Sequence, residues 1–177
     1  MVVKELFDRY ILALRTTAIG DKTEHTDRAA LQSLLQEFAD KTEQGIKVQH
    51  EPKRVADKGA PDFKVSKTGL ILGYVENKGI DENLTKVLKS EQIAKYKSLS
   101  SNIILTDYLD FVWINKYGPP QRERLCHATD LENRRFRLGE DRVEAVAKLL
   151  SGFFSSAPEG IGRAQQLALA LAQSTPA

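Results

Sequence analysis

The sequence predicts one α/β or α+β domain in which a central mixed β-sheet is flanked by helices. Two observations carry this prediction. Near residue 46 the spacing of apolar residues changes from a helical period to the alternation of a strand, and the run at 70–75 is apolar at almost every position. The elements then follow the core order α-β-β-β-α-β, with further helices at both ends, which is typical of a mixed sheet covered by helices.

Two amphipathic segments open the chain, each with apolar residues at three- and four-residue spacing. They contain Leu6, Tyr10, Ile11 and Leu14 in the first segment, and Leu31, Leu34, Leu35 and Phe38 in the second. The first predicted helix ends at Gly20. The second runs from about Glu24 to Gly45, and Thr23 or Thr26 is expected to cap its start.

Strands are predicted next. Residues 46–50 alternate between apolar and polar side chains, as in a half-exposed strand. A polar loop is expected at 52–60, followed by a second strand around Phe63 and a turn at 67–69. The strand at 70–75 is apolar on both faces, which predicts a central place in the sheet.

The rest of the chain predicts one helix, two strands, an edge strand and two closing helices. In order these are a helix at 84–99 after a break at 79–83, strands at 102–106 and 111–114, an edge strand at 122–127, and helices at 142–154 and after Gly162. Gln92 and Tyr96 are four residues apart on the first of these helices, so they share one face.

The composition indicates an intracellular globular protein. The 177 residues include one cysteine, Cys126, which excludes an internal disulfide and fits a reducing cytoplasm. No apolar run approaches the roughly 20 residues that cross a membrane, and the N-terminus lacks a secretory signal. Because the net charge is only +2, tight binding to nucleic acid would need a local basic cluster.

One such cluster is visible between the predicted edge strand and the following helix. It consists of Arg122, Arg124, Arg134, Arg135 and Arg137. These side chains either contact phosphates or form a solvated surface together with the acidic residues between them.

The residues with the clearest chemistry are Asp62, Glu76 and Lys78. Glu76 and Lys78 are two apart, so they leave the same face of one strand. A turn centred on Gly69 would bring Asp62 opposite Glu76, with about 5 Å between Cβ atoms. Two carboxylates this close repel, and a divalent cation between them would relieve the repulsion. Oxygen ligands near a phosphate substrate favour Mg²⁺, with Mn²⁺ as a substitute.

Plainer interpretations exist for each of these residues. A Glu-x-Lys strand commonly marks a solvated face, and Asp62 could be a turn carboxylate after Pro61. A charged trio beside so apolar a strand, however, needs compensation, which favours a site. The three histidines lack the spacing of zinc ligands. Cys126 and His127 are adjacent on a predicted strand, so a catalytic pair of these two is disfavoured.

These motifs resemble the PD-(D/E)xK nuclease superfamily. Pro61-Asp62 followed by Glu76-Asn77-Lys78 matches its central motif, and Gln92 with Tyr96 matches the Q-xxx-Y motif of its RecB-like and restriction-enzyme branches. The sequence around these motifs, about three-quarters of the chain, resembles the N-terminal nuclease domain of single-chain restriction-modification enzymes such as the type ISP group. The resemblance implies a restriction-endonuclease-like fold and Mg²⁺-dependent hydrolysis of duplex DNA that leaves 5′-phosphate ends.

The same resemblance implies roles for individual residues. Asp62 and Glu76 would bind the metal with the backbone carbonyl of Asn77, and Lys78 would be the catalytic lysine. The motif residues Gln92 and Tyr96 would brace the site or touch the DNA backbone. In relatives a helical glutamate completes the metal shell. Glu24 matches it, or is a first-turn carboxylate favoured by the helix dipole.

The resemblance also bears on domain organisation. Residues 1–156 would form the nuclease domain, and 157–177 a helical linker toward a methyltransferase or motor domain. A transient dimer would serve double-strand cleavage. The alternatives are a junction resolvase or exonuclease on the same fold, or a non-catalytic DNA-binding or docking module.

Overall fold

A six-stranded mixed sheet forms the central layer in the computed structural model, which describes residues 2–50, 59–158 and 171–172. Its strands are β1 (Ile46–His50), β2 (Phe63–Lys67), β3 (Leu70–Asn77), β4 (Ile103–Thr106), β5 (Asp110–Ile114) and β6 (Gln121–Arg124). They follow the same order in space as in the sequence, and only β3 and β4 run parallel. The predicted mixed sheet with a central, apolar third strand is confirmed.

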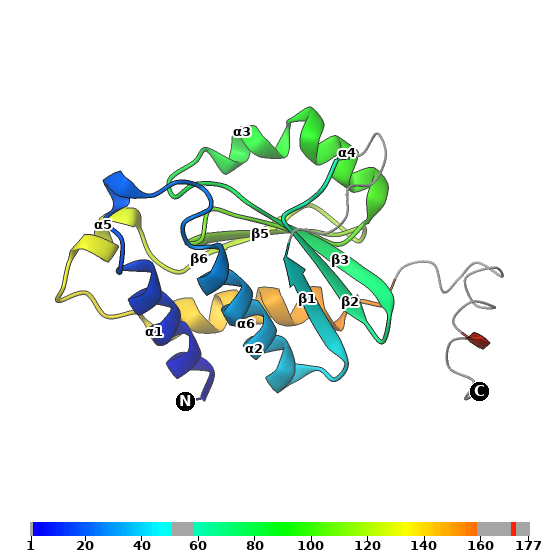
Figure 1. Ribbon diagram of the computed structural model, residues 1–177, viewed down its shortest axis with the longest axis horizontal. Helices are drawn as coiled ribbons and strands as arrows, with labels where there is room; N and C mark the ends of the chain where they lie inside the picture. Colours follow the sequence, from blue (N-terminus) through cyan, green and yellow to red (C-terminus); the bar gives the residue numbers. More distant parts are fainter. Residues whose placement is uncertain (1, 51–58, 159–170, 173–177) are drawn as a thin grey trace.

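Helices cover both faces of the sheet. On one face lie α1 (Val2–Leu14), α2 (Arg28–Thr42) and α6 (Glu140–Ser155), and on the other lie α3 (Leu84–Leu88) and α4 (Glu91–Leu99) (Figure 1). A short turn η1 (Ile19–Asp21) and the helix α5 (Ala128–Glu132) lie at the periphery. The sheet therefore separates a larger apolar core under α1, α2 and α6 from a smaller one under α3 and α4.

The β2–β3 hairpin sets the register of the candidate site. The turn at 67–69 is present as predicted, and a bulge after Val65 then shifts the pairing by one residue. As a result Phe63 pairs with Val75. The next residues in each direction, Asp62 and Glu76, come to lie opposite one another, as the sequence predicts.

The predicted boundaries of the first two helices are wrong. The first helix ends at Leu14, well before Gly20, and α2 begins after residue 27 instead of near Glu24. Asp27 holds the N-cap position of α2, and its carboxylate forms a buried ion pair with Lys22 at 2.5 Å. The hydroxyls of Thr23 and Thr26 lie 3.3 Å from each other, so residues 23–27 form turns that precede the helix.

The helix predicted at 84–99 is in fact two helices. Ser90 interrupts it, because its side chain accepts a hydrogen bond from the backbone N–H of Ile93 at 3.3 Å and thereby caps α4. The predicted edge strand at 122–127 is also shorter, since β6 ends at Arg124. His127 is the N-cap of α5, a helix that the sequence analysis missed.

Two predictions lie outside the described residues. They are most of the polar loop at 52–60 and the helix after Gly162, with most of the proposed linker at 157–177. Among the helices that the structure does describe, none is both long and apolar enough to cross a membrane.

Candidate active site

Asp62 and Glu76 are joined at the C-terminal end of β3 by reciprocal hydrogen bonds. The backbone N–H of Asp62 donates to Glu76 Oε2 at 3.2 Å, and the backbone N–H of Asn77 donates to Asp62 Oδ2 at 2.8 Å. Each carboxylate is therefore fixed by the strand that carries the other. The structure brings the two predicted carboxylates together, and the hairpin register is the reason.

The surroundings of Glu76 disfavour a negative charge on its carboxyl group beside the charge of Asp62. Its side chain is 5% exposed. Burial and the neighbouring Asp62 carboxylate raise the pKa of Glu76 to about 8, while the ammonium of Lys78 acts in the opposite direction. A metal-free site at neutral pH therefore holds one proton on this carboxyl group.

Lys78 points toward the same site from the same face of the strand. Its Nζ lies 3.5 Å from Glu76 Oε1 and donates to Gln92 Oε1 at 2.9 Å. Gln92 Nε2 in turn donates to the hydroxyl of Tyr96 at 3.1 Å, and that hydroxyl donates to the backbone carbonyl of Ala60 at 3.3 Å. This chain of contacts from α4 holds the ammonium group beside the carboxylates.

Tyr96 is buried, with 3% of its surface exposed. Of the two roles implied for Tyr96, bracing the site and touching DNA, its burial favours bracing. Gln92 is exposed on the same face of α4, so its side chain can contact a bound ligand in addition to Lys78.

Arg28 is a site residue that the sequence analysis missed. From the first turn of α2 its guanidinium forms an ion pair with Asp62 Oδ1, and its Nε donates to Asn77 Oδ1 at 3.2 Å. Both ionic side chains are mostly buried, at 14% and 11% exposure. A positive charge thus already lies against one of the two carboxylates. The sequence offers only a weak clue, an arginine at the start of a predicted helix.

The side chain of Asn77 supports the site from the opposite face of the strand. It is fully buried and donates to the carbonyl of Glu24 at 2.8 Å and to the hydroxyl of Tyr108 at 2.9 Å. Burial raises the pKa of Tyr108, which stays a neutral hydroxyl. These bonds, together with that of Arg28, tie the start of α2 to the end of β3.

Glu24 lies near the site, but mainly through its backbone. It belongs to the turn before α2, not to a helix as predicted, and it packs close to Gly79, directly after Lys78. Its carboxylate is 42% exposed and lies 3.9 Å from His25 Nδ1. In the part of the chain that the structure describes, no three His, Cys, Asp or Glu side chains form a group able to hold a metal. The side chain of Glu24 is therefore not part of a ready three-carboxylate cluster.

Cys126 and His127 do not form a competing nucleophilic site. Cys126 is buried, and burial raises the pKa of its thiol to about 11, so the nucleophilic thiolate is not formed at neutral pH. The His127 Nδ1 lies 3.0 Å from an Arg124 nitrogen instead of forming a pair with the thiol. The predicted reason for disfavouring a thiol–imidazole pair is wrong, because Cys126 and His127 follow β6 and do not lie on a strand.

Comparisons with known proteins bear on the fold. No protein-family model and no curated protein matches the chain. Among solved structures it is similar to a chain of the cryo-electron microscopy structure of a DrdV–DNA complex, with a TM-score of 0.65 and 24% sequence identity. The match covers 88% of this chain but only 14% of that one, so this chain spans a small part of its length. The similarity shows that the two proteins share a fold.

Proposed function

We propose that this chain is a Mg²⁺-dependent endonuclease domain that hydrolyses duplex DNA, with Asp62, Glu76 and Lys78 as its catalytic residues. The observation that carries the proposal is the convergence of these three side chains at the C-terminal end of β3. The resemblance to PD-(D/E)xK nucleases supports it. So does the shared fold with a chain solved in a complex with DNA.

The donor set fits a hard divalent cation. Asp62 and Glu76 supply carboxylate oxygens, and the backbone carbonyl of Asn77 is the further protein ligand that the resemblance implies. Mg²⁺ prefers oxygen ligands and keeps several waters, so a site with few carboxylates suits it. The pKa of Glu76 supports the same conclusion, because a cation would stabilise the carboxylate that burial and Asp62 destabilise.

Each protein group then has a definite task. When bound, the metal would acidify a water ligand and offset charge on the scissile phosphate. Lys78 donates hydrogen bonds toward the attacking oxygen or the phosphate oxygens, where negative charge grows in the transition state. Gln92 fixes the ammonium in that position, and Tyr96 fixes Gln92.

The larger organisation is part of the proposal. By resemblance, residues 1–156 act beside a methyltransferase or motor domain, with 157–177 as the connecting segment and a transient dimer for cleavage of both strands. The match to 14% of a much longer chain supports such an arrangement. DNA affinity would then come largely from the neighbouring domain, in agreement with the net charge of +2.

A nicking assay with a lysine variant tests the function. Incubated with supercoiled plasmid and Mg²⁺ or Mn²⁺, the protein is expected to nick the DNA, and EDTA is expected to stop it. Lys78→Met is expected to lower the rate about 100-fold, since it removes one transition-state donor. A four-way junction beside a linear duplex would separate a junction resolvase from an endonuclease.

The matched control is Lys41→Met. Lys41 is exposed near the end of α2, 13 residues and therefore about 20 Å along the helix from Arg28. This variant is expected to nick at the wild-type rate. Equal activity of the Lys78 and Lys41 variants would refute the assigned role of Lys78, and nicking that persists in EDTA would refute the metal requirement.

Arg28→Met is expected to tighten Mg²⁺ binding. The guanidinium occupies Asp62 Oδ1, so a metal that binds this oxygen must displace it. Removing an ion pair worth about 1 kcal/mol would lower the Kd for Mg²⁺ about fivefold. The metal-free variant should at the same time be less stable, by about 2 kcal/mol, because the mostly buried Asp62 carboxylate loses its counter-charge.

Isothermal titration with Mg²⁺ and thermal denaturation with and without the metal would measure both effects. Arg9→Met is the control, since Arg9 pairs with Glu37 on the surface of α1 and α2. A weaker affinity in Arg28→Met would show instead that the guanidinium holds Asp62 in place for the metal.

A further inference from the structure

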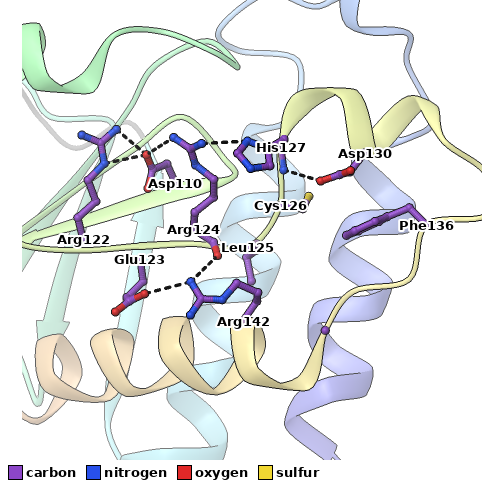
Figure 2. A pocket seen from close by; sticks show the side chains of 11 residues that line it. Asp110, Arg122, Glu123, Arg124, Leu125, Cys126, His127, Asp130, Phe136 and Arg142 are labelled. Carbon is purple, nitrogen blue, oxygen red and sulfur yellow. Dashed lines mark hydrogen bonds and ion pairs between the residues drawn. The ribbon is translucent and has the colours of Figure 1, made fainter.

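A cavity of about 530 Å³ lies between β6, α5 and the start of α6. Figure 2 shows Arg122 and Arg124 on either side of Asp110 at one end of it, with His127 beyond Arg124. None of these residues takes part in the site described above. They include two members of the basic region seen in the sequence.

Asp110 acts as a buried clamp for the two arginines. Its side chain is 2% exposed, and a single oxygen, Oδ2, accepts all three bonds. Arg122 donates to it from Nε at 2.8 Å and from Nη2 at 2.6 Å, and Arg124 donates from Nη2 at 3.2 Å. One buried carboxylate thus fixes two guanidinium groups and leaves them a net charge of +1.

Both guanidinium groups are partly exposed and have more N–H groups than the contacts described for them use. A guanidinium carries five N–H groups. Besides Asp110, the described contacts of Arg122 include Thr85 Oγ1 at 2.9 Å, and those of Arg124 include His127 Nδ1 at 3.0 Å. The two side chains are 38% and 44% exposed. Fixed, half-exposed guanidiniums with unused N–H groups are suited to bind phosphate oxygens.

The two other acidic side chains that line the cavity have contacts of their own. Glu123 Oε2 accepts from Arg142 Nη1 at 3.3 Å, and Asp130 Oδ2 accepts from the backbone N–H of His127 at 2.8 Å. Each of these carboxylates has its own partner. Arg142 neutralises Glu123, whereas Asp130 keeps its charge but lies beyond His127, away from the two guanidinium groups (Figure 2). The excess positive charge of Arg122 and Arg124 over Asp110 is therefore local to this end of the cavity.

The pair lies on the same sheet face as the catalytic residues. The strand register aligns Asn77, Thr106, Phe111 and Glu123 in one row across β3, β4, β5 and β6. Side chains one position away point to the other face. Lys78 follows Asn77 and Arg124 follows Glu123, so both side chains point to that other face. Three strand spacings of about 4.8 Å put the two residues roughly 14 Å apart.

We propose that Arg122 and Arg124, clamped by Asp110, form a second phosphate-binding site. This site would bind the DNA backbone several base pairs from the scissile phosphate. The inference rests on the proposed function. Duplex DNA carries a phosphate about every 3.4 Å along each strand, so a spacing of roughly 14 Å corresponds to about four base-pair steps. One duplex lying across the C-terminal end of β3 can then contact both sites.

Salt-dependent DNA binding tests the site without any cleavage. A fluorescein-labelled duplex is titrated with protein in EDTA at several salt concentrations, and anisotropy gives the Kd. Arg122→Gln/Arg124→Gln is expected to weaken binding at least tenfold. Its slope of log K against log salt should fall by about 2, since each phosphate contact contributes about 0.9.

Two further variants keep this test decisive. Because the double variant leaves Asp110 without its partners, Arg122→Gln/Arg124→Gln/Asp110→Asn is measured beside it, and the same loss is expected. Arg9→Gln/Lys41→Gln changes the net charge equally on the opposite sheet face and should keep the wild-type slope. An unchanged slope in folded Arg122 and Arg124 variants would overturn the inference alone. Wild-type protein that binds the duplex with the expected salt dependence but does not nick plasmid in Mg²⁺ or Mn²⁺ would overturn the proposed function and leave the phosphate contacts of Arg122 and Arg124 in place.

Discussion

The variant Gly73→Ala is expected to lose about 4 kcal/mol of folding stability, enough to unfold much of the protein. A Cβ atom at this position in β3 would lie 2.3 Å from the backbone carbonyl oxygen of Asn102 and 2.9 Å from Phe153 Cε2. The carbonyl cannot move away, because it accepts the N–H of Tyr74 at 3.1 Å in the pairing of β3 with β4. The added methyl group would therefore separate two central strands.

The buried side chain of Asn102 increases the cost. It donates to the carbonyls of Leu72 at 3.0 Å and Phe153 at 3.1 Å, and it accepts from Trp113 Nε1 at 2.7 Å. A displaced Asn102 would leave these buried polar groups without partners, each at a cost of about 1 to 3 kcal/mol.

Urea denaturation followed by circular dichroism would measure the loss. Gly118→Ala is the matched control, since a Cβ there has no atom within 4 Å and its stability should change by less than about 0.5 kcal/mol. A Gly73→Ala variant within 1 kcal/mol of wild type would mean that β3 and β4 can separate locally at little cost.

The convergence of Asp62, Glu76 and Lys78 could be predicted because its geometry is local. Alternation along one strand puts Glu76 and Lys78 on one face, and a hairpin joins that strand to Asp62. The sequence predicts a turn centred on Gly69. In the structure Lys67 pairs with Leu70 next to the turn, and a bulge then gives the predicted pairing of Asp62 with Glu76. This bulge, after Val65, adds the missing residue to the register.

Arg28 could not be predicted because its partners are distant in the sequence. It meets Asp62 across 34 residues and Asn77 across 49 residues, and nothing near Arg28 in the chain indicates these contacts. An arginine in the first turn of a helix usually stays in water. Only the packing of α2 against the end of β3 turns it inward.

The helix boundaries failed for a different reason. A continuous apolar stripe at 84–99 predicts one helix, although Ser90, a favoured N-cap residue, followed by the acidic Glu91 is typical of a helix start and could have shown the break. At α2, two threonines with the usual capping side chains competed with Asp27. Asp27 holds the cap position while its carboxylate pairs with Lys22, a contact that requires the tertiary fold.

Glu76→Gln is expected to abolish metal-dependent nicking and, unusually for a buried change, to stabilise the metal-free protein at high pH. The glutamine keeps the shape but cannot supply a carboxylate ligand. Losing about 4 kcal/mol of metal-based stabilisation would lower the rate about a thousandfold. The stability effect follows from the pKa of Glu76, which rises from 4.5 to about 8 on folding.

Between pH 4.5 and 8 the folded protein binds a proton at Glu76 that the unfolded chain has released. The free energy of unfolding therefore falls as the pH rises through this window. Glu76→Gln lacks this titration, so its advantage over wild type should grow by at most roughly 1.4 kcal/mol per pH unit through this window and by about 5 kcal/mol in all. Urea denaturation in EDTA at pH 5 and at pH 9 measures that difference, with the exposed Glu144→Gln on α6 as the control. Saturating Mg²⁺ should stabilise wild type much more than the variant, because the variant keeps Asp62 but lacks the second carboxylate ligand. A pH-independent difference in EDTA would refute the raised pKa of Glu76, and equal stabilisation of both proteins by Mg²⁺ would remove Glu76 from the metal site.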